Sequence, residues 1–281
     1  MKVGVIGAGT MGNGIAHVFA MHGYSVILVD INSTILDNAV SIIKQNLTRQ
    51  FNKQLISKDT IELTTKNIKV SNNIESLKSC NLVVEAIKED LNLKGEIFQK
   101  LDLICDQKTI IASNTSSISI NSLANYTNRA DKIIGMHFMN PVPVMKLVEI
   151  INGDKTSRNT ADFIINLSKD LGKIPVECND SPGFVSNRIL MPMINEAVHC
   201  FDQGVASIES IDSIMKLGMG HPMGPLKLAD LIGVDVCLFI LNVLFDSFKD
   251  KKYKPSKLLV KMVKENKLGK KSGEGFYKYE F

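Results

Sequence analysis

The chain of 281 residues contains no tryptophan and only 8 prolines, and its 5 cysteines are odd in number and include no C-x-x-C pair. A hydrophobic content of 44% with few prolines excludes a disordered or collagen-like chain. The cysteine spacing excludes a disulfide framework and a cysteine-based zinc site, and we expect no metal. This cysteine usage indicates a reducing, cytoplasmic compartment.

Long apolar runs are also missing. The run Cys237–Leu241 is stopped by Asn242, far short of the roughly 20 apolar residues that a membrane span needs. Residues Met1–Gly7 enter a strand at once and leave no room for the charged and apolar regions of a signal peptide. The sequence therefore predicts no membrane association and no leader.

Charge of one sign is not in excess, since 33 basic and 29 acidic residues give a net charge of +4. The charges are dispersed, so we expect no nucleic-acid partner, although a local site for an anionic ligand stays open. No G-x-x-x-x-G-K-[ST] motif is present, which argues against a nucleoside triphosphatase of that type.

The first two thirds of the chain alternate strand and helix patterns. Short apolar, β-branched runs predict buried strands at Val3–Ile6, Ser25–Val29, Ile68–Val70, Leu82–Val84, Ile110–Ala112, Ile133–Met136 and Lys146–Ile151. Between the second and third of these runs, apolar residues recur every four positions over Ser33–Gln54, which predicts a helix with Ser33 as its N-cap. Strand, helix and strand in this order predict an α/β fold with a mostly parallel sheet, covered on both faces.

The pattern changes after Cys178, because the remaining apolar residues follow helical spacing. Ser181 as N-cap and Pro182 at the first helical position predict a helix that Pro192 ends or kinks. Length alone predicts about two domains. We therefore expect a first domain over residues 1–182 and an all-α second domain over residues 183–281.

The second domain is predicted to hold a helix that starts near Ser207 and a longer apolar helix that runs to about Phe248. The glycine- and proline-rich loop Gly218–Pro225 separates the two. Together these apolar helices exceed what one small bundle needs.

The segment Gly7-Ala8-Gly9-Thr10-Met11-Gly12 follows a predicted strand and opens a helix, which is the context of a dinucleotide-binding fingerprint. Gly7 permits a tight turn, Gly9 lets backbone amides approach a pyrophosphate, and Gly12 lets the helix pack close to the strand. Asp30 stands 18 residues after Gly12, near the usual spacing of about 20 for a carboxylate that binds the adenine ribose and repels a 2′-phosphate. No arginine follows Asp30 directly, so the motif predicts NAD rather than NADP in a Rossmann-type domain. A glycine turn beside an acidic surface residue is the alternative.

Polar groups follow or interrupt three later apolar runs, at Ser113–Ser117, His137 and Glu149. A buried carboxylate is unfavourable unless it is paired, so Glu149 is expected to pair with His137. Histidine can take the proton of a carbinol as hydride leaves the carbon, and the glutamate would fix its tautomer. A purely structural pair is equally consistent with this spacing. His17 and His22 lie on or just after the first helix, where packing and surface roles are expected.

Six segments together carry a family resemblance. They are Gly7–Gly12, Val84–Ile87 with Glu89 and Lys94, Ser113–Ser117, His137–Pro141, Asp180–Arg188 and Gly273–Tyr277. In these segments the chain resembles the 3-hydroxyacyl-CoA dehydrogenase family, and the match spans essentially its whole length. The length and gapless order are similar to those of the short bacterial 3-hydroxybutyryl-CoA dehydrogenases, which lack the hydratase module of fused relatives.

For catalysis, the resemblance implies His137 as the acid/base and Glu149 as its orienting partner. It implies that Ser116 and Asn187 hydrogen-bond the reacting oxygen of the substrate or hold it beside the nicotinamide. Asn187 would reach the site from the second domain, which would place catalysis between the two domains.

For the cofactor, the resemblance implies Asp30 on the ribose. The residues that it places around the nicotinamide half are Glu89, Lys94, Ser116 and Asn140. One basic residue near the C-terminus also belongs to the pattern, and the adjacent Lys270 and Lys271 are both candidates.

Arg49 and Lys53 are four residues apart and therefore share one helix face. In the family this region binds the phosphates of coenzyme A, and two cations suit that polyanion. Lys53 is the preferred candidate of the two, and a solvated helix face is the alternative.

The residues predict an NAD-dependent dehydrogenase, and the resemblance implies an enzyme of fatty acid and butyrate metabolism that interconverts an (S)-3-hydroxyacyl-CoA, in particular 3-hydroxybutyryl-CoA, and its 3-ketoacyl-CoA. The stereochemistry and a homodimer formed through the helical domain are implied by the resemblance alone. One alternative is a dehydrogenase of a sugar acid or free 3-hydroxy acid, which would not need Arg49 and Lys53. Another is a non-catalytic, crystallin-like relative that keeps the cofactor site.

Overall fold

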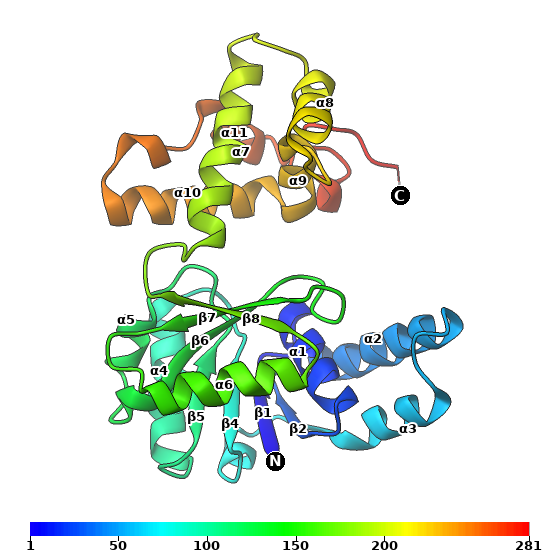
Figure 1. The fold of residues 1–281 in the computed structure, drawn as a ribbon, viewed down its shortest axis with the longest axis vertical. Coiled ribbons are helices and arrows are strands. Elements are labelled where there is room, and N and C mark those ends of the chain that lie inside the picture. The colour runs from blue at the N-terminus through cyan, green and yellow to red at the C-terminus, as the bar shows by residue number, and fades with distance from the viewer. Residues whose placement is uncertain (281) are drawn as a thin grey trace. The chain divides into compact units, whose positions relative to one another are not determined.

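The computed structural model describes residues 1–280 and divides the chain after Asp180 into two compact units (Figure 1). The N-terminal unit runs from Met1 to Asp180, and the C-terminal unit begins at Ser181. The boundary expected from the sequence, after residue 182, lies two positions further along.

An eight-stranded sheet forms the centre of the N-terminal unit, in the order β3-β2-β1-β4-β5-β6-β7-β8. Its strands are β1 (Lys2–Ile6), β2 (Ser25–Val29), β3 (Ile68–Ser71), β4 (Leu82–Glu85), β5 (Ile110–Ser113), β6 (Ile133–Phe138), β7 (Leu147–Asn152) and β8 (Ile174–Asn179). All neighbours pair in parallel except β6 and β7, which are antiparallel. The predicted mostly parallel, Rossmann-type sheet is confirmed.

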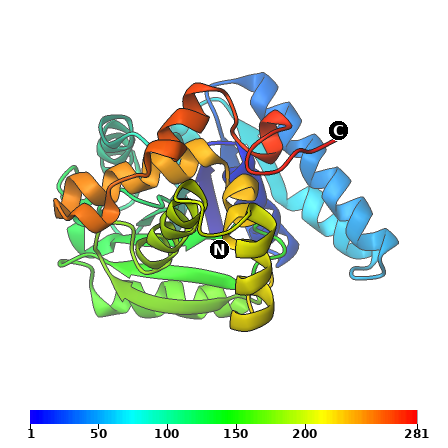
Figure 2. The same cartoon turned by 90° about the horizontal axis from the view of Figure 1, so that it is seen from above.

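Helices cover both faces of this sheet. They are α1 (Thr10–Met21), α2 (Ser33–Asn52), α3 (Lys58–Asn67), α4 (Leu91–Ile104), α5 (Ile120–Ala124) and α6 (Arg158–Asp170). Alternate strand residues such as Val3 and Val5 form the main core with α1, α2 and α6, because successive side chains of a strand point to opposite faces. The helices α4 and α5 pack against each other on the other face, and α2 and α3 lie side by side (Figure 2).

The N-cap of α2 differs from the prediction. Asn32, not Ser33, precedes the first helical residue, and its side-chain oxygen accepts hydrogen bonds from the amides of Thr34 and Ile35. Asparagine and serine are comparable N-caps, so composition does not decide between neighbours. The helix ends at Asn52, two residues before the predicted end.

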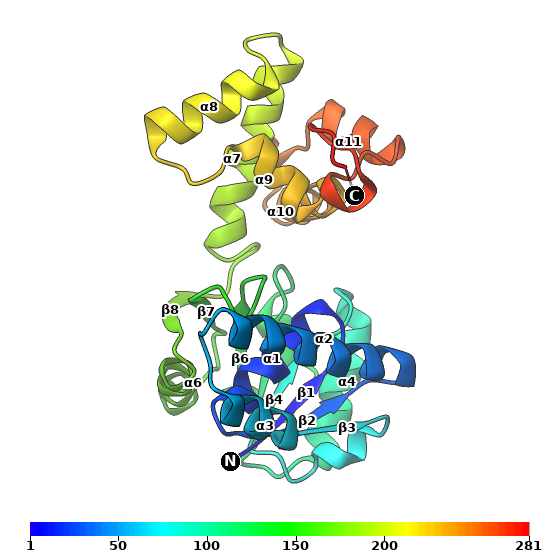
Figure 3. The same ribbon diagram turned by 90° about the vertical axis from the view of Figure 1, so that its right-hand side faces the viewer.

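The C-terminal unit consists of helices, as predicted (Figure 3). They are α7 (Ser186–Asp202), α8 (Ile208–Met219), α9 (Pro225–Ile232), α10 (Val234–Phe248) and α11 (Lys257–Lys264), with short 3₁₀ turns at Lys251–Tyr253 and Lys270–Ser272. Their buried faces meet in a separate core that includes Met191, Ile194 and Leu241.

The predicted start of the first helix in this unit is wrong. The helix begins at Ser186 rather than at Pro182, because Gly183 and Phe184 have φ angles of +73° and +51°. Two consecutive residues in the left-handed region cannot belong to a right-handed helix. The helix then continues through Pro192 to Asp202, so that proline does not end it.

The predicted long apolar helix is two helices. They are α9 and α10, and they meet at Gly233 with a bend of 97°. No single helix in residues 1–280 is long and apolar enough to cross a membrane, and only this bent pair together reaches that length and composition.

His17 on α1 is fully buried, and neither of its ring nitrogens has a hydrogen-bond partner in the described part of the chain. Burial, reinforced by the nearby charges of His22 and Lys173, lowers the pKa of His17 to about 4. The unfolded chain therefore binds this proton more tightly than the folded chain does.

We expect the N-terminal unit to lose stability, by at most about 3 kcal/mol, as the pH falls from about 6.5 towards about 4. Above about pH 6.5 His17 is neutral in both the folded and the unfolded chain, so this loss of stability does not occur. Thermal unfolding followed at several pH values measures how steeply stability depends on pH. His17→Leu should flatten it, whereas His199→Gln, in the C-terminal unit, should leave it unchanged. An unchanged slope in His17→Leu would contradict the assignment.

Candidate active site

The buried pair His137–Glu149 lies on two neighbouring strands. His137 is the penultimate residue of β6, and Glu149 stands directly opposite it in the antiparallel ladder with β7. Their Nδ1 and Oε2 atoms are 2.8 Å apart, and the two residues are 8% and 4% exposed. Directly opposite residues of an antiparallel pair have adjacent side chains. The sheet register itself therefore forms this pair.

Glu149 determines how the imidazole is oriented. A carboxylate accepts hydrogen bonds, so its contact with Nδ1 favours the tautomer that carries a proton on Nδ1 and a lone pair on Nε2. The predicted pair is present, and its geometry suits proton transfer at Nε2.

Glu89 is the centre of a second group of polar residues, after β4. Its Oε1 accepts hydrogen bonds from the hydroxyls of Thr115 and Ser117, at 2.5 and 2.8 Å, and from the amides of Ser116 and Ser117, both at 3.0 Å. Burial alone would raise the pKa of Glu89, but the ammonium of Lys94 and these hydrogen bonds outweigh it and lower the pKa. The loop that carries Ser116 is thus fixed on an ionised carboxylate.

Lys94 on α4 is fully buried and binds two glutamates. Its Nζ lies 2.6 Å from Glu85 Oε1 and 3.3 Å from Glu89 Oε2. Glu85, at the end of β4, also accepts from the Ser113 hydroxyl at 2.6 Å. Full burial raises the pKa of Glu85 against the opposing effect of Lys94. In this structure Lys94 orients Glu89, and direct contact of Lys94 with a cofactor stays a prediction.

The glycine-rich turn between β1 and α1 has the shape that a dinucleotide requires. Gly7 has a φ of +92°, and a Cβ atom on Gly12 would lie 1.7 Å from the carbonyl oxygen of Gly7. A Cβ atom on Gly9 would meet no protein atom within 4 Å. The turn is therefore closed on its protein side and open at Gly9, beside the N-terminus of α1. This combination fits a phosphate that approaches the backbone.

Asp30, directly after β2, supports this turn. Its Oδ2 accepts a hydrogen bond from the amide of Ala8 at 2.9 Å, and its Oδ1 accepts from the amide of Asn32 at 3.0 Å. The carboxylate is half-buried beside the glycine-rich turn. This position agrees with a ribose-binding role, which remains a prediction.

Asn140 lies in the loop that follows β6 and is exposed, with a cis peptide bond to Pro141. The neighbouring loops at the ends of β5 and β6 are joined, because Asn114 Oδ1 accepts from the amide of Phe138 at 2.8 Å. His137, Ser116 and Asn140 therefore all lie at or just after the carboxyl ends of adjacent strands. Open α/β sheets bind their ligands at this edge.

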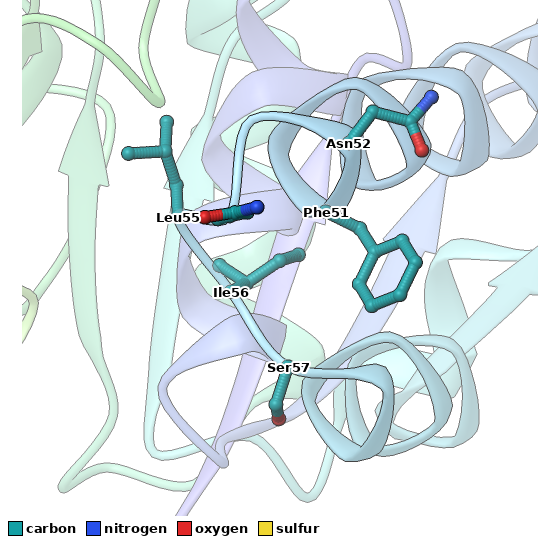
Figure 4. A pocket seen from close by; sticks show the side chains of 6 residues that line it. Phe51, Asn52, Leu55, Ile56 and Ser57 are labelled. Carbon is teal, nitrogen blue, oxygen red and sulfur yellow. The ribbon is translucent and has the colours of Figure 1, made fainter.

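The cations Arg49 and Lys53 are both exposed at the end of α2. The turn that follows forms a surface pocket of about 680 Å³ (Figure 4). Its lining residues are Phe51, Asn52, Gln54, Leu55, Ile56 and Ser57. The sequence predicts the two cations but not the apolar side chains beside them. Phe51 continues the four-residue apolar repeat of α2, and Leu55 follows four residues later, beyond the end of the helix.

Two predicted site residues belong to the C-terminal unit. Asn187 is 8% exposed in the first turn of α7. Lys271 forms an ion pair with Asp235 of α10, at 2.6 Å, whereas Lys270 is exposed. Their proposed contacts with substrate and cofactor stay predictions. Among residues 1–280, no group of three or more histidine, cysteine or carboxylate side chains has a metal-site geometry.

Comparison with known proteins decides the family. The model of the 3-hydroxyacyl-CoA dehydrogenase NAD binding domain matches residues 2–181, and the model of the C-terminal domain matches residues 183–279. The chain belongs to the 3-hydroxyacyl-CoA dehydrogenase family. As a member of that family it is an oxidoreductase that uses NAD.

Similar 3-hydroxyacyl-CoA dehydrogenases occur in distant organisms. The chain is 50% identical over 279 residues to the 3-hydroxybutyryl-CoA dehydrogenase of Clostridioides difficile, covering 99% of both chains. It is 46% identical over 285 residues to the mitochondrial hydroxyacyl-coenzyme A dehydrogenase of Homo sapiens, covering 99% of this chain and 91% of that one. The crystal structure of (S)-3-hydroxybutyryl-CoA dehydrogenase PaaH1 from Ralstonia eutropha is 48% identical, with a TM-score of 0.96, and covers 100% of this chain and 99% of that one.

Proposed function

We propose that the protein catalyses the NAD-dependent interconversion of (S)-3-hydroxyacyl-CoA and 3-ketoacyl-CoA, with 3-hydroxybutyryl-CoA and acetoacetyl-CoA as its main substrates. The observation that carries this proposal is the buried His137–Glu149 pair at the carboxyl edge of the sheet, in a chain of this family. Relatives at about 50% identity carry the name 3-hydroxybutyryl-CoA dehydrogenase, which supports the four-carbon substrate.

His137 moves the proton. In the oxidation, its Nε2 takes the proton of the 3-hydroxyl group, and Glu149 stabilises the resulting imidazolium from the Nδ1 side. In the reduction, the imidazolium returns that proton to the oxygen of the 3-keto group. Ser116 and Asn187 hydrogen-bond this oxygen and orient it towards His137.

NAD, when bound, supplies the acceptor for the hydride that leaves C3 of the substrate. The turn at Gly7–Gly12 fits its pyrophosphate, because it is open at Gly9 and close to the N-terminus of α1. Asp30 binds the adenine ribose and disfavours a 2′-phosphate. Glu89, Ser116 and Asn140 line the nicotinamide half, with Lys94 holding Glu89, and Lys270 or Lys271 adds a cation.

Coenzyme A binds at the end of α2. Lys53 and Arg49 contact its phosphates, and the pocket at Phe51–Ser57, which has both apolar and polar lining residues, offers a surface for the adenine. A free 3-hydroxy acid or a sugar acid would not need these two cations, because it lacks the phosphate groups of coenzyme A. The pocket beside the two cations therefore favours the thioester over those substrates.

We expect turnover of acetoacetyl-CoA with NADH to exceed that of free acetoacetate by orders of magnitude. The double variant Arg49→Gln/Lys53→Gln should raise the KM for acetoacetyl-CoA about tenfold with kcat nearly unchanged, since exposed cations contribute binding energy far from the reacting carbon. Lys66→Gln, an exposed lysine on α3, is the control. Equal turnover of thioester and free acid would contradict the substrate assignment.

The protein forms a homodimer through its C-terminal unit. That unit exposes large apolar side chains on α8, where Ile214, Leu217 and Met219 are each more than half exposed. Apolar side chains that gather on one helix surface commonly mark an interaction site. Light scattering should give the mass of two chains, and the mass of one would contradict the dimer.

We place the enzyme in the cytoplasm and in fatty acid and butyrate metabolism.

A further inference from the structure

Lys173 is a buried lysine that the mechanism does not use. It stands directly before β8 and is 8% exposed. Its Nζ donates hydrogen bonds to the carbonyl oxygens of Val142, at 2.5 Å, and Met145, at 2.8 Å. Both acceptors belong to the loop at residues 139–146, which joins β6 to β7. The ammonium therefore cross-links a loop that begins two residues after His137.

This ammonium is held by backbone carbonyl groups alone. No carboxylate in residues 1–280 forms an ion pair with Lys173, and burial lowers its pKa. A buried charge that is balanced only by neutral acceptors is unfavourable, and an apolar side chain of the same length would pack at lower cost. Stability alone therefore does not account for a lysine at this position.

The loop at 139–146 is fixed on two further sides. Val142 is buried against α1, so closely that a Cβ atom on Gly14 would lie 2.9 Å from its Cβ. The amide of Ile174, next to Lys173, donates to the carbonyl oxygen of Lys146 at 2.8 Å. The loop thus lies between β8 and the helix that begins at the glycine-rich turn. Lys173 holds the central part of the loop through its two hydrogen bonds.

We propose that Lys173 is a positioning residue of the cofactor site: its ammonium holds the 139–146 loop, and with it Asn140, in the conformation that receives the nicotinamide cofactor. Lys173 acts on the cofactor only through the loop. The inference rests on the proposed contact between Asn140 and the cofactor.

The test compares Lys173→Met, which keeps most of the length of the side chain but removes the ammonium, with Lys173→Arg, which keeps the charge and hydrogen-bond donors. Lys169→Met, on the exposed side of α6, is the matched control. NADH affinity is measured by fluorescence titration well below each variant's unfolding temperature. Hydrogen exchange is measured at the amides of Val144 and Met145, which both donate to Pro141 in the wild-type loop.

We expect Lys173→Met to weaken NADH binding at least tenfold and to speed exchange at these two amides. Lys173→Arg should restore affinity to within about threefold of the wild type, and Lys169→Met should match the wild type. If Lys173→Met does not fold, Lys173→Gln, which is shorter and carries no charge, should still weaken NADH binding several-fold. A lower unfolding temperature with unchanged NADH affinity in the folded variant would overturn the proposal.

Asn140→Ala separates the two assumptions. If it binds NADH as the wild type does while Lys173→Met does not, the loop position matters but the contact assigned to Asn140 is wrong. If both variants bind NADH normally while His137→Ala is inactive, Lys173 has no positioning role and the proposed function still stands.

Discussion

Replacing His137 by alanine is expected to lower kcat by about 10² to 10⁴ while leaving NADH affinity within a few-fold of the wild type. The loss follows from the removal of the group that exchanges the proton with the 3-hydroxyl, since general acid–base catalysis contributes about this factor. Steady-state reduction of acetoacetyl-CoA gives kcat, and fluorescence titration gives NADH affinity. Full activity in His137→Ala would refute the mechanism and would favour a cofactor-binding protein without this chemistry.

Glu149→Gln is the companion variant. Glutamine keeps the size of the side chain but gives the imidazolium no charged partner, so kcat should fall less than in His137→Ala and NADH binding should persist. The double variant His137→Ala/Glu149→Gln should have the same kcat as His137→Ala alone, because Glu149 acts only through His137. Additive losses would show that Glu149 has an independent role.

Gly12→Ala is expected to abolish NADH binding and to destabilise the N-terminal unit. Its methyl group would lie 1.7 Å from the carbonyl oxygen of Gly7, so either α1 or the turn must move. Backbone atoms cannot move aside as the end of a flexible side chain can. Such overpacking typically lowers the free energy of unfolding by about 1 to 3 kcal/mol, and occasionally by more. Thermal unfolding and NADH titration measure the two effects.

Gly9→Ala is the matched control for this prediction. Its methyl group meets no protein atom within 4 Å, and Gly9 has a φ of −64°, which alanine adopts readily. The variant should therefore fold with nearly wild-type stability but bind NADH at least tenfold more weakly, because the methyl group occupies the space through which a phosphate approaches the amides. Unchanged NADH affinity in Gly9→Ala would show that the pyrophosphate lies elsewhere.

Much of the fold is predictable from local patterns. The strands that precede Gly7 and Asp30 are short apolar runs. Such runs can be recognised in the sequence because the strands of a parallel sheet are buried on both faces. The pairing of His137 with Glu149 could also be expected, since a carboxylate in an apolar strand needs a partner. Its geometry depends on the register between β6 and β7, which the sequence shows only through the length of one loop.

The errors have a different physical origin. The start of α7 is set by Gly183 and Phe184 in the left-handed region, and Phe184 is buried, so tertiary packing overrides the local N-cap pattern of Ser181 and Pro182. The burial of Lys94 between Glu85 and Glu89 depends on how α4 packs against the end of β4, although both glutamates are near it in the sequence. A lysine on a helix gives no local indication that its charge points into the interior.

The order of the strands in the sheet makes the two members of the catalytic pair inequivalent. In the order β4-β5-β6-β7, the histidine lies on the strand next to β5 and its Ser113–Ser117 loop, whereas the glutamate lies one strand further out. Neighbouring strands are about 4.8 Å apart. Exchanging the two residues would keep a hydrogen-bonded pair but move the imidazole by about that distance away from the reacting carbon. Strand order therefore dictates which of the two positions must carry the histidine.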